Sequence, residues 1–148
     1  MTVYLDASAL VKAYVGEPES DRVRRGLRTW KATTSVYTRI EVASGVRRRA
    51  RAGELSQNAA AQAMRSLHRH TARMRLVEVT PGVVARALKL LGRHALRAGD
   101  ALQLASALEI AAVTGVSVRF LCYDERLAMA ARAEHLAEPS DGASATPR

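Results

Sequence analysis

Short apolar segments alternate along this chain with longer segments of helical periodicity, and this alternation restricts the possible folds more than any other feature. The strand-like segments are residues 3–5, 32–35, 76–79 and 118–121. Between them, apolar residues recur at spacings of three and four, as they do in helices that bury one face. Parallel strands are joined by such helical crossovers, so the pattern predicts an α/β sandwich: a short central parallel sheet flanked by helices on both faces.

The apolar stripes of three helical segments predict which faces are buried. Residues 36–52 carry one stripe and the helix that follows Thr80-Pro81-Gly82 carries another. Residues 98–115 are apolar nearly all round, which predicts a helix inside the domain. The residues expected to face inward are Val36, Ile40, Ala43, Val46 and Ala50 in the first stripe, and Val84, Leu88, Leu91 and Ala95 in the second.

Length and composition predict one domain over residues 1–135, because 148 residues that are 48% hydrophobic can form a substantial core. Residues 136–148 are rich in Pro, Gly, Ser and Ala and are expected to form a disordered tail. No apolar run approaches the ~20 residues of a membrane span. The single cysteine, Cys122, excludes an internal disulfide and fits a reducing compartment, so a cytoplasmic location is expected.

The formal net charge of +9 is concentrated in one part of the chain. Ten basic residues and one acid, Glu41, lie between positions 22 and 51. A basic face attracts polyanions, and phosphate backbones are its usual partners. The alternative is a solvated face in an arginine-rich proteome. Aromatic residues make up only 4% of the chain, which argues against base-stacking platforms of the kind that bind single strands.

Four acids occupy matched positions relative to the expected strands. Asp6 follows the first strand and Asp124 follows the last, while Glu41 and Asp100 lie in the first turns of two helices. The carboxyl ends of parallel strands share one edge of a sheet, so these side chains are expected to converge there. Carboxylates without His or Cys select Mg²⁺ or Mn²⁺, ions that promote phosphodiester hydrolysis. The alternative for the aspartates is ordinary helix capping, and for Glu41 a pair with an arginine of its own helix.

The four acids lie in four short stretches of the chain: "VYLDASALVKAYVGEPES", "TSVYTRIEVASGVRR", "LRAGDALQLASAL" and "FLCYDERLAMAA". In order and spacing these stretches resemble the signature motifs of PIN-domain proteins, and of VapC-type ribonuclease toxins in particular. The resemblance runs from about residue 3 to residue 133. It implies a parallel sheet flanked by helices and an acidic, Mg²⁺- or Mn²⁺-dependent site that cleaves RNA. It also implies a homodimer and an antitoxin protein that binds it.

The same resemblance implies roles for individual residues. Asp6 and Asp100 match metal ligands, and Glu41 and Asp124 match acids that bind metal directly or through water. Ser8 matches a small hydroxyl residue that forms hydrogen bonds within the site. Cys122 departs from the family pattern, which has Ser or Thr two residues before the fourth acid, and a thiol is the weaker donor. Burial of Cys122 as a small apolar residue is the favoured interpretation.

Two arginines, Arg47 and Arg48, are expected to bind nucleic acid because they follow Glu41 along one helix. Arg48 is the better placed, since seven residues separate it from Glu41 and bring it to nearly the same face. Two other functions remain open: a PIN nuclease of RNA maturation without an antitoxin, and a non-catalytic basic protein that binds nucleic acid. An aspartyl phosphatase is disfavoured because "DASAL" lacks a second acid two residues after the first.

Overall fold

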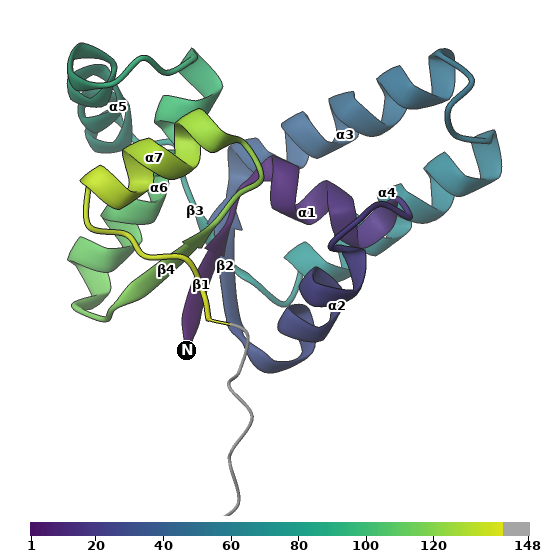
Figure 1. Cartoon of the computed structure of the whole chain (residues 1–148), viewed down its shortest axis with the longest axis horizontal. Coiled ribbons are helices and arrows are strands. Elements are labelled where there is room, and N and C mark those ends of the chain that lie inside the picture. The colour runs from purple at the N-terminus through teal and green to yellow at the C-terminus, as the bar shows by residue number, and fades with distance from the viewer. Residues whose placement is uncertain (141–148) are drawn as a thin grey trace, which may run out of the picture.

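A computed structural model describes residues 1–140 and consists of a parallel sheet between two groups of helices (Figure 1). The strands are β1 (Thr2–Leu5), β2 (Lys31–Ser35), β3 (Arg75–Val77) and β4 (Val118–Leu121). The helices are α1 (Ala7–Tyr14), α2 (Ser20–Thr29), α3 (Val36–Arg51), α4 (Gln57–Thr71), α5 (Pro81–Arg93), α6 (Ala98–Thr114) and α7 (Glu125–Ala133). None of the helices in this described part is long and apolar enough to cross a membrane.

The sheet has the order β3-β2-β1-β4, and all its pairings are parallel. Successive side chains of a strand point to opposite faces, and the central strand β1 supplies both cores of the domain. Val3 and Leu5 pack with helices α1 to α4 on one face. Tyr4 packs with helices α5 to α7 on the other, where its ring stacks on Phe120. Figure 1 shows these two groups on either side of the sheet, which confirms the predicted α/β sandwich.

The predicted inward face of α5 is wrong, and that of α3 is correct at Val46, which is fully buried, but wrong at Ile40. In α3 the buried residues are Thr38, Val42 and Val46, and Ile40 is 67% exposed. In α5 they are Val83, Ala87 and Leu90, and Leu88 is 65% exposed. The apolar residues of each helix form two adjacent stripes of similar spacing. In α3, the polar Thr38 can be buried because its hydroxyl is hydrogen-bonded. In α5, a small residue such as Ala87 permits close packing. In both helices the less apolar stripe therefore faces the core. The prediction for α6 is confirmed, because Ala101, Leu104, Ala105 and Ala107 are fully buried.

The packed part of the chain extends past residue 135, the predicted domain boundary. Leu136 is buried, and the carbonyl of Ala137 accepts a hydrogen bond from the Phe120 amide at 2.9 Å. Glu138 forms an ion pair with Arg22 at 2.8 Å. Residues 136–140 therefore contact β4 and α2, which differs from the predicted tail. The rest of that tail, residues 141–148, lies outside the described residues.

Candidate active site

A cavity of about 620 Å³ lies at the carboxyl edge of the sheet, and all four predicted acids line it. Asp6 follows β1, Glu41 lies in α3, Asp100 lies in the first turn of α6, and Asp124 precedes α7. The residues that join a strand end to the next helix come together at this edge in a parallel sheet. The structure therefore brings side chains that are up to 118 positions apart (from 6 to 124) to one cavity.

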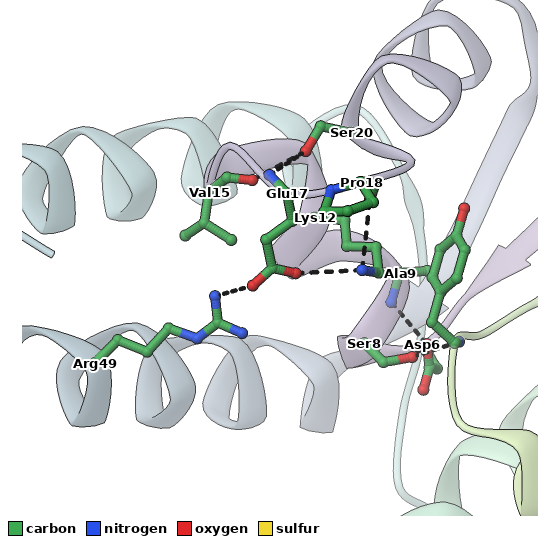
Figure 2. A network of polar contacts seen from close by, with 10 residues as sticks. Asp6, Ser8, Ala9, Lys12, Val15, Glu17, Pro18, Ser20 and Arg49 are labelled. Carbon is green, nitrogen blue, oxygen red and sulfur yellow. Dashed lines mark hydrogen bonds and ion pairs between the residues drawn. The ribbon is translucent and has the colours of Figure 1, made fainter. Parts of the chain in front are cut away.

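Asp6 is the most buried of the four acids, with 5% of its surface exposed. Its Oδ1 atom accepts hydrogen bonds from the Ser8 hydroxyl at 2.7 Å and from the Ala9 amide at 2.9 Å (Figure 2). Burial raises the pKa of this carboxyl from its ordinary 3.8 to about 7, an effect that the hydrogen bonds oppose and the nearby Glu41 carboxylate reinforces. Asp6 is therefore a group whose charged form is poorly solvated without a cation.

Ser8 and Cys122, which the sequence suggested as supporting residues of the site, have different surroundings. Ser8 donates to Asp6 and also accepts a hydrogen bond from the Tyr123 amide at 2.8 Å, so it joins the first acid to the loop after β4. The thiol of Cys122 instead points toward the carbonyl oxygen of Asp124, at 3.5 Å, and packs against the core formed by α5 to α7. Burial raises the pKa of this thiol to about 12, so it stays protonated at neutral pH. Cys122 does not line the cavity.

Glu41 is held by Gln103, a residue whose role the sequence did not reveal. Gln103 is 1% exposed, and its Nε2 atom donates to Oε2 of Glu41 in a short hydrogen bond. Its Oε1 atom accepts from the Tyr4 hydroxyl at 2.6 Å and from the Thr38 hydroxyl at 3.0 Å. These two donors set the orientation of the carboxamide. The sequence held one signal for this role: Gln103 is an amide in a largely apolar helix, one turn after Asp100.

Gly99 provides the space in which Glu41 lies. A Cβ atom at position 99 would be 2.8 Å from Oε1 of Glu41 and 3.1 Å from the Tyr37 hydroxyl. The pKa of Glu41 is raised, mainly by burial and also by the Asp100 carboxylate, although the Gln103 bond opposes the shift. Glu41 does not pair with an arginine of its own helix among the ion pairs of residues 1–140. A glycine at this point therefore lets α6 approach the acid closely.

Asp100 and Asp124 cap helices and also line the cavity. Asp100 accepts from the Arg97 amide at 3.3 Å, and Asp124 accepts from the Leu127 amide at 2.9 Å. Burial raises the pKa of Asp100, and the charge of Asp124 adds to this effect. The helix-cap interpretation is thus correct for Asp6, Asp100 and Asp124, and it does not exclude a second role. In each of the four carboxylates the hydrogen bonds named above go to one oxygen, and the other oxygen accepts none of them.

The donor chemistry of the cavity fits a hard divalent cation. Its acids are carboxylates, its lining has neither His nor Cys, and burial together with mutual repulsion raises the pKa of Asp6, Glu41 and Asp100. As they stand, no three His, Cys, Asp or Glu side chains within residues 1–140 are grouped closely enough to hold an ion.

The arginines near the cavity differ in their partners. Arg48 and Arg97 line the cavity and make no ion pair within the described chain. Arg49 also lines it, but pairs closely with Glu17, which Lys12 contacts at 3.2 Å (Figure 2). Arg47 lies elsewhere, in a separate cavity between α3 and α4. Arg47 therefore does not line the carboxylate-lined cavity, whereas its neighbour Arg48 does.

Comparisons with known proteins agree with this geometry. Residues 3–133 match the family model of the PIN domain. The chain is 34% identical over 132 residues to Ribonuclease VapC46 of Mycobacterium tuberculosis, covering 88% of this chain and 90% of that protein.

Two solved structures share the fold. VapC20 of Mycobacterium tuberculosis, described as a sarcin-ricin loop cleaving toxin, superposes with a TM-score of 0.68 at 19% identity, over 93% of this chain and 98% of that one. The PAE2754 protein of Pyrobaculum aerophilum gives a TM-score of 0.63 at 19% identity, over 88% and 84% of the two chains.

The fold and the cavity together define a class, the parallel α/β proteins whose strand ends carry a cluster of carboxylates. Within that class, this chain belongs to the PIN-domain family and is a homologue of a VapC ribonuclease. PIN domains are nucleases, and VapC members of the family generally use a divalent metal ion.

Proposed function

We propose that this protein is an endoribonuclease that hydrolyses RNA phosphodiester bonds with Mg²⁺ or Mn²⁺ in the carboxylate-lined cavity. One observation carries the proposal: four carboxylates from four separate elements line a single cavity, together with the unpaired guanidinium groups of Arg48 and Arg97. When bound, a divalent ion would polarise the phosphoryl group and lower the pKa of a water molecule.

The residues that line the cavity would have different roles in this reaction. Asp6 and Asp100 would hold the ion, with Glu41 and Asp124 binding it directly or through water. Ser8 and Gln103 orient two of these acids through the hydrogen bonds described above. Arg48 and Arg97 would bind the RNA backbone on either side of the scissile bond, because guanidinium groups recognise phosphate oxygens well.

Cleavage of RNA by the purified protein tests this proposal. The wild type is compared with Asp6→Asn, Asp100→Asn and Glu41→Gln, each with Mg²⁺, with Mn²⁺ and with a chelator. Glu78→Gln is the matched control, because Glu78 is exposed and lies outside the cavity. We expect cleavage to require a divalent ion and to be lost in the three cavity variants but not in the control. RNA binding without cleavage would instead favour the non-catalytic alternative. Undiminished cleavage by Asp6→Asn would show that Asp6 is only a helix cap and would refute the role proposed for it.

We also propose that the protein is a cytoplasmic toxin that forms a homodimer and is neutralised by an antitoxin protein. The similarity to VapC46 supports this proposal. Expression should arrest growth, and co-expression of a small gene adjacent to it should restore growth. Growth that continues while the purified protein cuts RNA would favour a role in RNA maturation.

A further inference from the structure

A second groove lies at the opposite edge of the sheet from the carboxylate-lined cavity. Its volume is about 770 Å³, and β2 and β3 contribute residues from the positions where they begin. We call it the basic groove, because five cationic side chains line it and no acid does: Arg24, Arg28, Lys31, Arg73 and Arg75. Trp30 lines it as well. Figure 1 shows the ends of α2 and α4 meeting the sheet at this edge.

The cations of the basic groove are largely free of partners. Arg28, Lys31, Arg73 and Arg75 are exposed, and none of them forms an ion pair within residues 1–140. Arg24 alone contacts an acid, Asp21, at 3.6 Å. Like charges held near one another repel, and an anion bound between them relieves this repulsion. The groove is thus arranged for a ligand with several negative charges.

Trp30 is the only tryptophan of the chain, and the fold holds its ring in a fixed place. The indole packs against α2 at Gly26, where a Cβ atom would overlap the ring. Leu27 and Met74 supply apolar surface beside it. The groove therefore combines a preorganised aromatic surface with exposed cations, the combination that binds bases and phosphates of a single strand.

We propose that the basic groove binds the RNA substrate at a second point, away from the bond that is cut. This inference rests on the proposed function for the identity of the ligand. RNA matches both features of the groove, because it supplies phosphates for the cations and a base for Trp30, whereas an acidic peptide matches only the charge. Strand β2 has five residues, so the two edges of the sheet are about 15 Å apart. An RNA strand stacked at ~3.4 Å per nucleotide needs about five nucleotides to span this distance, so a short oligonucleotide of two nucleotides cannot reach both edges.

Intrinsic fluorescence tests the proposal directly, because Trp30 is the only tryptophan. The protein is titrated in a chelator, which prevents cleavage, with transfer RNA, with a short RNA oligonucleotide, with inorganic phosphate and with polyglutamate. The groove variant is Arg28→Ala/Arg75→Ala. Its control, Lys89→Ala/Arg132→Ala, removes the same charge from exposed positions outside the groove.

Transfer RNA should quench Trp30, and the groove variant should bind it more weakly. The slope of log K against log salt should fall by about 1.4 in that variant, for two lost phosphate contacts at ~0.7 each, and should change less in the control. The KM for transfer RNA should rise, and the kinetics with the short oligonucleotide should stay unchanged. No quenching by transfer RNA, equal weakening in both double variants, or quenching by polyglutamate or phosphate to the same extent would overturn the proposal. If RNA quenches Trp30 but no metal supports cleavage, the groove stands as an RNA site and the proposed function fails.

Discussion

Replacing Gln103 by leucine should destabilise the protein and reduce cleavage, and the size of the first effect follows from its contacts. Gln103 joins β1, α3 and the carboxylate-lined cavity, because it accepts from Tyr4 and Thr38 and donates to Glu41. Leucine has a similar size but neither accepts nor donates. The Tyr4 hydroxyl, in a residue that is fully buried, would then lose the acceptor at 2.6 Å.

Gln103→Leu removes the acceptor of two buried donors, Tyr4 and Thr38. A buried donor left without a partner costs about 1–3 kcal/mol, and loss of the bond to the half-buried Glu41 adds about 1 kcal/mol. With the low end of the range for each donor, because the Ser106 hydroxyl lies near that of Tyr4, we expect the free energy of unfolding to fall by about 3 kcal/mol, from a total that is typically about 5–15 kcal/mol. This corresponds to a decrease in Tm of about 6–12 °C for a domain of this size. Cleavage should also fall at temperatures far below the new Tm, because Glu41 is no longer oriented.

Urea unfolding of a double-mutant cycle with Tyr4→Phe measures the coupling. Tyr4→Phe removes the hydroxyl that Gln103→Leu leaves unpartnered, so the double variant should recover about 1–2 kcal/mol relative to Gln103→Leu alone. Two single effects that add to within ~0.5 kcal/mol would refute the reasoning, since they would mean that Tyr4 and Gln103 do not depend on each other.

Three further predictions concern single residues. Without metal, the free energy of unfolding should fall as the pH rises from 3.8 to about 7, because the folded Asp6 carboxyl holds its proton more tightly than the unfolded one. Asp6→Asn should flatten this part of a plot of the free energy of unfolding against pH, and an unchanged plot would contradict the prediction. Arg48→Ala should weaken RNA binding and lower its salt slope by about 0.7, whereas Arg47→Ala, in its separate cavity, should leave the slope measured in a binding titration nearly unchanged. Gly99→Ala should keep or slightly raise Tm, because alanine favours helix by about 1 kcal/mol, yet reduce cleavage by displacing Glu41; full activity in this variant would show that the close approach is unimportant.

The sequence predicted the strands and the helices well, because short apolar runs and helical spacing carry their own signals. It placed the four acids correctly at one edge, since that follows from parallel topology alone. The buried face of α5 was wrong, because this helix has two apolar stripes of similar spacing. The buried face of α3 was predicted correctly at Val46 but not at Thr38, because the hydroxyl of Thr38 is hydrogen-bonded to a residue 65 positions away and periodicity does not contain such information. Gln103 went unrecognised for the same reason: its role depends on three partners from separate elements. Helical spacing favoured Arg48 over Arg47, and Arg48 lines the carboxylate-lined cavity whereas Arg47 lines another; the role of Arg47 in binding nucleic acid stays a prediction.

The bond between Ser8 and the Tyr123 amide has a consequence for the motions of the domain. Because Ser8 also donates to Asp6, a change at the first carboxylate reaches the backbone that carries Asp124 through a single hydroxyl. Ion binding at Asp6 would then slow opening of the segment between β4 and α7. The amide hydrogen of Tyr123 should exchange with solvent more slowly when the cavity is filled, so a peptide group outside the cavity would report its occupancy.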